Sequence, residues 1–241
     1  MAIILQPGAQ KMNLVEPVVV VIISANGEWR VALDLLRPEQ VQRTPYGEWF
    51  RHPIENRPLI FMYGGWGKIS AAATAQYAID IWQPDLLINL GTCGGFAGAI
   101  ERDTIVLVEQ TLVYDIIEQM SDANAAIEFF STQLDLSWLK QPYPQPVLRT
   151  RLVSADRDIL AQDIPHLQQR FGAVAADWES GAIAWVCHHN GVRCLILRGV
   201  TDLVGAAGGE AYGNVEVFHS GARRVMSDLL AALPGWLQCA L

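Results

Sequence analysis

The sequence predicts an α/β fold with a largely buried central sheet. Short apolar segments alternate with helical segments over the whole length, which is typical of a sheet covered by helices. Residues 17–24 (PVVVVIIS) are apolar on both faces, as expected of a strand covered on both sides. The chain has 241 residues, of which 51% are hydrophobic and only 17% charged, so a mainly disordered protein is excluded.

The order of the elements follows from apolar runs and from the residues that interrupt them. Strands are expected at residues 17–24, 40–44, 48–51, 59–63, 85–90, 104–109, 147–154, 173–176 and 193–200. The second and third flank Pro45-Tyr46-Gly47, which is typical of a hairpin. Helices are expected at residues 28–36, 68–82, 159–171, 181–190 and 215–233, the last ended by Pro234-Gly235.

Two segments are not assigned to regular elements. Residues 91–95 (GTCGG) are too rich in glycine, and residues 114–135 are polar and irregular. Because no linker, repeat or low-complexity stretch divides the chain, we expect one domain over residues 1–241, with residues 1–16 as an N-terminal extension.

Composition and charge exclude several classes of function. Seventeen Lys and Arg against 25 Asp and Glu give a net charge of −8, which lacks the basic surface that nucleic-acid binding requires. No run approaches the roughly 20 apolar residues of a membrane span, and the first 17 residues lack the pattern of a signal peptide. The sequence therefore predicts neither a nucleic-acid nor a membrane partner.

The cysteines and histidines indicate no metal site. The four cysteines form no CxxC pair, and three of them lie in apolar surroundings, which favours reduced thiols in a cytoplasmic protein. His188 and His189 end an apolar helix without a third ligand, so a helix cap is the better interpretation. We expect no metal and no cofactor.

Polar and glycine-rich segments follow five of the predicted strands. They are residues 24–28 (SANGE), 64–68 (GGWGK), 91–95 (GTCGG), 177–180 (DWES) and 201–202 (TD). Ligands of open α/β folds bind beyond the carboxyl ends of the strands, so these segments predict a polar, glycine-lined cleft.

Three carboxylates are the candidates for chemistry, and each has a structural alternative. Glu179 lies among small and apolar residues, where a carboxylate needs partners or a function, but it or Asp177 equally suits a helix N-cap. Asp202 after an apolar strand suits an Asx-turn. Glu28 in a first helical turn suits the helix dipole.

Three segments in order resemble the nucleoside phosphorylase and nucleosidase superfamily. They are GGWGKISAAATA, PDLLINLGTCGGFAGAIERDTIVL and ADWESGAIAWVCHHNGVRCLILRGVTD. The resemblance extends from about Val18 to the last helix and is strongest to the bacterial 5′-methylthioadenosine/S-adenosylhomocysteine nucleosidases. It implies a three-layer α/β/α sandwich whose mixed sheet forms a distorted barrel, a dimeric or hexameric assembly, and cleavage of the N-glycosidic bond of a nucleoside.

The resemblance also implies a role for individual residues. Asp202 is implied as the acid at N7 of a purine, and Glu28 as the base that activates water. Glu179 is implied to bind the ribose hydroxyls, and Trp178 to pack under the sugar. The remaining substrate-binding candidates are Thr92 and Gly94 in the glycine-rich turn, Arg198 near the water site, Asp158 and Ile159 near the base, and Tyr212 near the 5′-substituent.

The sequence leaves two questions open: whether water or phosphate accepts the sugar, and which nucleobase the substrate carries. Asn89 stands where several phosphorylases of the superfamily carry an arginine, which favours water, although Arg30 and Arg198 together suit a phosphate. Asp158 stands where adenine-specific nucleosidases carry a stacking aromatic residue, so the base is not fixed. A purine nucleosidase is expected; a futalosine hydrolase, a phosphate-dependent phosphorylase and a non-catalytic nucleoside-binding protein are the alternatives.

Overall fold

The computed structural model describes residues 16–241, so most of the expected extension at residues 1–16 lies outside the described part of the chain. Its strands are β1 (Val19–Ile23), β2 (Gln42–Thr44), β3 (Gly47–Ile54), β4 (Arg57–Tyr63), β5 (Leu86–Phe96), β6 (Ile105–Val113), β7 (Ser131–Gln133), β8 (Leu148–Ser154), β9 (Ala175–Asp177), β10 (Arg193–Gly205) and β11 (Gly208–Gly209). Its helices are α1 (Asn26–Leu36), α2 (Gly67–Trp82), α3 (Ala123–Phe129), α4 (Ile164–Phe171), α5 (Ser180–His189) and α6 (Val215–Ala240), with a 3-10 helix at Ala161–Asp163.

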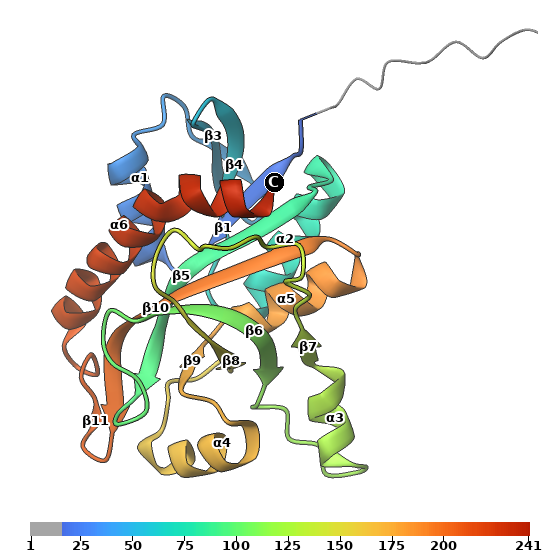
Figure 1. Cartoon of the computed structure of the whole chain (residues 1–241). Coiled ribbons are helices and arrows are strands. Elements are labelled where there is room, and N and C mark those ends of the chain that lie inside the picture. Colours follow the sequence, from blue (N-terminus) through green and yellow to red (C-terminus); the bar gives the residue numbers. More distant parts are fainter. Residues whose placement is uncertain (1–15) are drawn as a thin grey trace, which may run out of the picture.

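All the strands belong to one mixed sheet, part of which closes into a barrel (Figure 1). The strand order is β11-β10-β6-β8-β9-β5-β1-β4-β3-β2, and an additional pairing of β10 with β5 closes a ring of five strands. Strands β10, β5, β1 and β4 are neighbours and run parallel. Their carboxyl ends therefore meet at one edge of the sheet.

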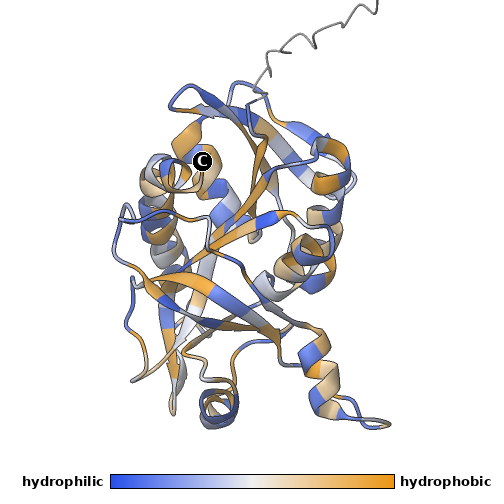
Figure 2. Ribbon diagram, turned by 45° about the vertical axis from the view of Figure 1, so that its right-hand side comes forward, coloured by the Kyte–Doolittle hydropathy of each residue, from blue (hydrophilic) through white to orange (hydrophobic). Residues whose placement is uncertain are grey.

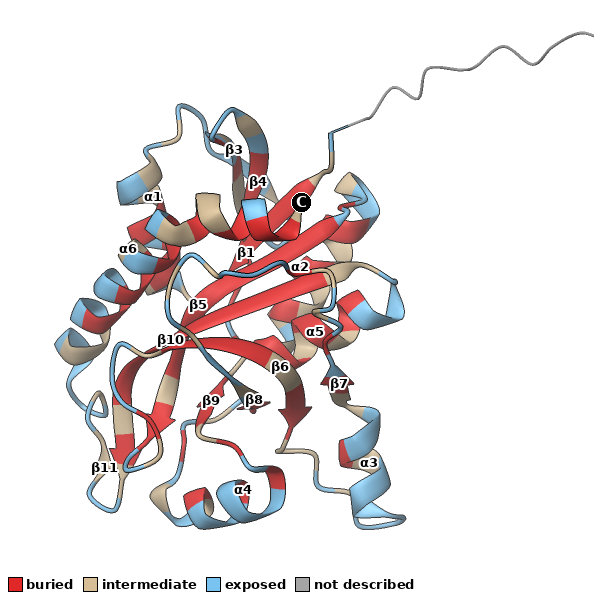
Figure 3. Ribbon diagram, viewed as in Figure 1, coloured by how far each residue is buried: buried red, intermediate tan, exposed pale blue. Residues whose placement is uncertain are grey.

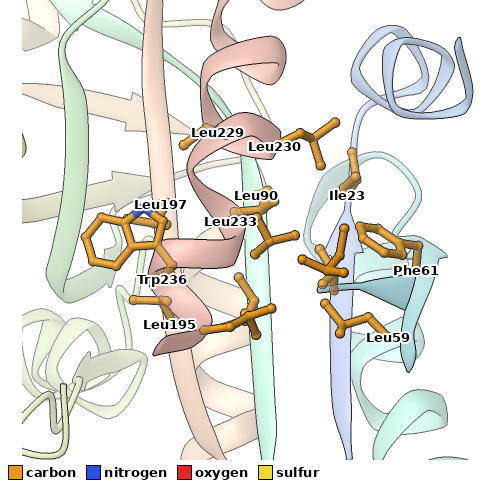
Figure 4. Packing of buried hydrophobic residues seen from close by; sticks show 14 of the residues in the cluster. Ile23, Leu59, Phe61, Leu90, Leu195, Leu197, Leu229, Leu230, Leu233 and Trp236 are labelled. Atoms are coloured by element: carbon orange, nitrogen blue, oxygen red, sulfur yellow. The ribbon is translucent and has the colours of Figure 1, made fainter. Parts of the chain in front are cut away.

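Helices cover both faces of the sheet, as the α/β/α sandwich requires. One apolar cluster joins α1 and α6 to the inner strands, with Leu229, Leu233 and Trp236 of α6 packed on Leu90 and Leu197 (Figure 4). A second cluster joins α2 and α5 to the opposite face, and a third packs α4 beneath the barrel. The strands are buried almost throughout, whereas the outer helix faces are exposed and hydrophilic (Figures 2 and 3).

The small residues of α2 explain how closely it packs. The side chains of Ala71, Ala75 and Ala78 on α2 are completely buried and belong to the second apolar cluster. Because these side chains are so short, they allow the backbone of α2 to pack close to its neighbours. No helix of residues 16–241 combines the length and the hydropathy that crossing a membrane requires.

The expectation that residues 91–95 are irregular is wrong. They form the second half of β5, paired with β10 on one side and β9 on the other. A Cβ at Gly91 would lie 2.1 Å from Nη1 of Arg198, and one at Gly95 would lie 2.7 Å from Cγ2 of Ile100. Glycine is required here for the close approach of neighbouring side chains, not for a turn.

Pro234 does not end the last helix, which continues to Ala240. An internal proline costs about 3 kcal/mol, through a lost hydrogen bond and a steric clash. Trp236 beyond it is completely buried, and burying the 150–250 Å² of a tryptophan contributes about 4–6 kcal/mol. Burial of the following turn therefore outweighs the proline.

Other differences concern where elements begin and end. β10 continues five residues beyond the expected 193–200, with a bulge between Val200 and Asp202, and then turns back into β11. The expected helix 159–171 is regular only from Ala161, and the irregular segment 114–135 contains α3 and β7. The hairpin expected around residues 45–47 is confirmed by the pairing of β2 with β3.

The crowding at Gly91 leads to a stability prediction. Gly91→Ala forces the added methyl group into the guanidinium of Arg198, so we expect a loss of about 1–3 kcal/mol in the free energy of unfolding. Urea denaturation measures the loss. Gly205→Ala is the control, because its Cβ would lie 3.0 Å from only one atom, Cβ of Ala97. Equal stability of Gly91→Ala and the wild type would contradict the close packing.

Candidate active site

A cavity of about 910 Å³ opens at the carboxyl ends of β10, β5, β1 and β4. Nine of the ten candidate site residues line it: Glu28, Thr92, Gly94, Asp158, Ile159, Trp178, Glu179, Asp202 and Tyr212. The tenth, Arg198, is fully buried and lies behind the lining. Arg30, considered for a phosphate site, is exposed on α1 and does not line the cavity.

Glu28 joins the ends of β1 and β5. Its Oε1 accepts hydrogen bonds from the backbone N–H of Thr92 at 2.7 Å and from the Thr92 hydroxyl at 2.6 Å. Its Oε2 accepts a bond of 3.3 Å from the N–H of Ala25, at the start of α1. The carboxylate thus meets the helix N-terminus, as the structural alternative held, while it also lines the cavity.

The sequence left open whether Asp177 or Glu179 caps the N-terminus of α5, and the structure assigns the cap to one of them. Asp177 holds the N-terminus of α5, because its Oδ2 accepts bonds from the Ser180 N–H at 3.0 Å and the Ser180 hydroxyl at 2.5 Å. Glu179 makes no side-chain cap of α5 and instead accepts a bond of 3.2 Å from the N–H of Gly67, at the start of α2. The cap interpretation therefore applies to Asp177, which leaves Glu179 facing the cavity.

Arg198 is the buried cation that these acids share. Its Nη2 lies 3.0 Å from Oδ2 of Asp177 and 3.9 Å from Oε2 of Glu179. The same Nη2 donates to Oδ1 of Asn89 at 2.7 Å, and Nε donates to the Ser180 hydroxyl at 2.9 Å. All of its nitrogens therefore meet protein acceptors, since Nη1 also donates to the Thr92 carbonyl.

Burial shifts the pKa of both glutamates upward. Desolvation raises the pKa of Glu179 to about 8, with the charges of Asp177 and Glu28 adding to the rise and that of Arg198 opposing it. The pKa of Glu28 is also raised by burial, against the opposing effects of Arg198 and the Thr92 hydrogen bonds. At Glu179 the charge of the single cation Arg198 opposes burial and the two neighbouring carboxylates but does not outweigh them.

Asp202 also lines the cavity, and it lies inside β10 rather than in a turn after it. The Thr201 hydroxyl donates to its Oδ1 at 2.7 Å, and burial raises its pKa. Nearby, the Tyr212 hydroxyl donates to the carbonyl of Ile159 at 2.9 Å, which joins residues after β11 to residues after β8. A carboxyl group with one oxygen held and a raised pKa is suited to donate a proton.

Three aromatic side chains that line the cavity were not among the candidate site residues. Tyr63 at the end of β4, Trp66 before α2 and Phe218 on α6 all line it. Trp66 stacks on Trp178, with ring centroids 5.2 Å apart and planes 24° apart. The position of Trp66 in the GGWGK segment after a strand was the available signal, whereas Phe218 comes close only through the packing of α6 on Gly27.

The fold and the cavity define a class of protein. The family model described as the phosphorylase superfamily matches residues 19–233, so the chain belongs to the phosphorylase superfamily. Residues 16–241 contain no cluster of His, Cys, Asp and Glu suited to a metal ion. At the end of α5, His189 instead contacts the Trp185 carbonyl through Nδ1 at 2.9 Å.

The particular relatives are nucleosidases. The 5′-methylthioadenosine/S-adenosylhomocysteine nucleosidase of Halalkalibacterium halodurans is 25% identical over 206 residues, covering 79% of this chain and 86% of the relative. That of Thermotoga maritima is 26% identical over 157 residues, covering 64% and 70%.

Solved nucleosidase structures share the fold. A Helicobacter pylori mutant enzyme with 5′-methylthioadenosine in its active site superposes with a TM-score of 0.75 at 16% identity, covering 91% of this chain and 99% of that one. The 5′-methylthioadenosine nucleosidase of Arabidopsis thaliana gives 0.75 at 19% identity, covering 90% and 95%. The expected sandwich with a barrel-forming mixed sheet is thereby confirmed.

The raised pKa of Glu179 predicts a stability that falls with pH. Ionising this carboxyl is costly only in the folded protein, so its contribution is full below the ordinary value of 4.5 and is lost as pH rises through about 8. In Glu179→Gln this loss disappears. The unfolding temperature of the variant should therefore rise relative to the wild type between about pH 5 and pH 8, measured by circular dichroism.

Glu128→Gln is the matched control for that comparison, because Glu128 is exposed on α3. Its unfolding temperature should follow the wild type across the same range. Parallel curves for Glu179→Gln and the wild type would show that the Glu179 carboxyl is not destabilised by burial.

Proposed function

We propose that the protein hydrolyses the N-glycosidic bond of a purine nucleoside of the methylthioadenosine type and releases free base and free sugar. The observation that carries the proposal is the convergence of Glu28, Glu179 and Asp202 on one cavity. Cleavage of this bond needs a proton for the leaving base, charge stabilisation for the sugar and a base for the attacking water. The three carboxyl groups supply one function each.

Water is the acceptor that the charges of the cavity favour over phosphate. Five acidic residues line it, namely Glu28, Asp158, Asp177, Glu179 and Asp202. Arg157 is the one cationic side chain among the described lining residues, and its Nη2 is bonded to Asp163 at 2.5 Å. A phosphate dianion would therefore meet net negative charge.

Glu28 also occupies the donors that an incoming anion would need. Both the N–H and the hydroxyl of Thr92 donate to this carboxylate. Asn89, at the position discussed for a phosphorylase arginine, is fully buried and donates to the Ile22 carbonyl at 3.0 Å. These contacts support a hydrolase over a phosphorylase.

The proposed reaction assigns one step to each of the three carboxyl groups. Asp202 donates its proton to N7 as the bond from C1′ to N9 breaks and the electron pair leaves with the base. Glu179 binds the 2′- and 3′-hydroxyls and stabilises the positive charge of the sugar. Glu28 accepts a proton from the water whose oxygen bonds to C1′. Proton exchange with solvent then returns Asp202 and Glu28 to their starting states.

The substrate-binding roles of the other candidates follow the same arrangement. In the proposed complex Trp178 packs under the sugar, Thr92 and Gly94 border the attacking water, Asp158 and Ile159 border the base, and Tyr212 lies near the 5′-substituent. Arg198 acts as a positioning residue, because it contacts Asp177 and Glu179 from behind the cavity. The base remains a purine of unspecified kind, since Asp158 offers no ring for stacking.

Assembly and compartment belong to the same proposal. Ile69, Ile117 and Met120 are 84%, 76% and 95% exposed, and the ion pair of Lys68 with Asp115 brings their segments together. This apolar surface supports a homo-oligomer. Sedimentation velocity that shows only monomer at micromolar concentration would contradict the oligomer.

The four cysteines are free and buried, which supports a cytoplasmic location.

Product analysis tests the acceptor and the reaction. The purified protein is incubated with methylthioadenosine, S-adenosylhomocysteine, inosine, adenosine, futalosine and uridine, each with and without phosphate. We expect free base and free sugar in both conditions. A sugar 1-phosphate that forms only with phosphate would contradict water as the acceptor, and intact nucleosides throughout would contradict the enzymatic function.

Paired carboxamide variants test the two proton transfers. Asp202→Asn cannot protonate the base, and Glu28→Gln cannot accept a proton from water, so each should lower kcat by about 10²–10⁴-fold. The affinity for the nucleoside should change far less, as measured by calorimetry. Asp158→Asn is the comparison, because it alters a lining carboxylate without a proton-transfer role. Wild-type turnover in either of the first two variants would remove that residue from the mechanism.

A further inference from the structure

Three charged side chains near the cavity have no place in the proposed reaction. They are Lys68 at the start of α2, Asp115 two residues after β6 and Asp156 two residues after β8. All three lie outside the lining of the cavity. Strands β6 and β8 run parallel with Val113 opposite Ser154, so each aspartate follows its strand by the same number of residues. The register of the sheet therefore brings the two carboxylates together.

Lys68 joins both carboxylates. Its ammonium is paired with Oδ1 of Asp115 and lies 3.9 Å from Oδ2 of Asp156. Each aspartate uses its other oxygen for a backbone N–H: Oδ1 of Asp156 accepts from Lys68 at 2.7 Å, and Oδ2 of Asp115 accepts from Asp156 at 2.9 Å. Only 18% of the side-chain surface of Lys68 and of Asp115 is exposed. These contacts link the three residues in a closed set, the Lys68 cluster, which holds backbone as well as side chains.

The Lys68 cluster fixes the first turn of α2, a helix that has no cap of its own. Trp66 at the N-cap position offers no side-chain acceptor, so the free N–H groups of the first turn need acceptors from other segments. Asp156 accepts from the N–H of Lys68. Glu179 accepts from the N–H of Gly67, one residue earlier, at 3.2 Å. Adjacent N–H groups therefore hold one carboxylate outside the cavity lining and one inside it, and both suit the helix dipole.

Gly67 leaves little room beside the Asp156 carboxylate. Its φ is +80°, and a Cβ there would lie 2.8 Å from Oδ1 of Asp156. The residue whose N–H meets Glu179 is thus packed against an oxygen of the Lys68 cluster. A shift of the Asp156 carboxylate therefore moves the Gly67 N–H, and with it the Glu179 oxygen that this N–H holds.

We propose that the Lys68 cluster positions Glu179: it holds the start of α2 so that the N–H of Gly67 fixes the Glu179 carboxylate for the 2′- and 3′-hydroxyls of the ribose. This inference rests on the proposed function and adds residues that act on the sugar without touching it. Hydrogen bonds depend on direction, so a carboxylate that loses a fixed contact binds the two hydroxyls less selectively.

The ribose preference measures this role. It is the ratio of kcat/KM for a ribonucleoside to that for its 2′-deoxy counterpart, with methylthioadenosine, adenosine and inosine as probes. Asp156→Ala removes the acceptor of the Lys68 N–H, so the ratio should fall roughly tenfold, as for the loss of one hydrogen bond to a charged group. Lower stability alone would reduce both values equally and leave the ratio unchanged, which would overturn the positioning role.

Three further variants separate the contributions to the ratio. Asp156→Asn keeps an oxygen for the Lys68 N–H and should retain most of the ribose preference. Lys68→Met removes the ammonium between two aspartates, so their repulsion should lower the ratio in the same direction as Asp156→Ala. Asp80→Ala is the matched control, because it makes the same change at an exposed position near the other end of α2 and should keep the wild-type ratio.

A double variant shows whether the Lys68 cluster acts through Glu179. Glu179→Ala should itself remove most of the ribose preference, and adding Asp156→Ala should then leave the ratio unchanged. Dissociation constants measured by calorimetry in the Asp202→Asn background give the same comparison without cleavage. A further fall of the ratio in the double variant would contradict action through Glu179.

The outcomes separate this inference from the proposed reaction. If the wild type cleaves nucleosides and Asp156→Ala keeps the ribose preference, the positioning role is wrong and the reaction stands. If the wild type binds nucleosides without cleaving them, and the binding preference falls in Asp156→Ala but not in Asp80→Ala, the positioning role stands and the reaction is wrong. If the wild type binds no nucleoside, both are wrong.

Discussion

The ion pair between Arg198 and the carboxylates around it is the interaction on which the site depends. Arg198 lies on β10, Asp177 ends β9, Glu179 precedes α5 and Asn89 lies on β5. A guanidinium buried this deeply is tolerable only if its donors are all used, and each of these elements supplies an acceptor. The pair thus fixes the relative positions of three barrel strands. Burial is the main cause of the raised pKa values of Glu28 and Glu179, and at Glu179 the charges of Asp177 and Glu28 add to it.

The second requirement of the site is that the backbone of β5 comes close to the Arg198 guanidinium. The guanidinium reaches its partners because Gly91 has no side chain, and the barrel closes over it through the pairing of β5 with β10. Glycine at this position therefore contributes to the electrostatics of the site as much as to the packing. The close contact of Gly91 with Arg198 thus serves both the polar site and the closure of the barrel.

The sequence predicts elements whose signal is local and misses those decided by distant contacts. The apolar runs of β1 and the alanines of α2 carry their own pattern, so both were assigned correctly. Residues 91–95 and Pro234 carry local signals for turns, but the neighbours of Gly91 and the burial of Trp236 override them. In the site, carboxylates in apolar segments were recognisable by type. The division of labour between Asp177 and Glu179, and the meeting of Trp66 with Trp178, required two chain segments whose proximity no local pattern encodes.

The pairing of β5 with β10 also has a consequence for how the chain acquires its structure. These two strands are roughly 100 residues apart in sequence, and they pair in parallel over most of their length. Loop-closure entropy makes such contacts slow to form, so formation of this pair is expected to limit the folding rate. During synthesis, β5 has β1 as a partner long before β10 emerges from the ribosome. The cavity is therefore completed only in the last stage of folding, because β10 carries Arg198 and Asp202, and any ligand of the cavity stabilises only chains that have completed it.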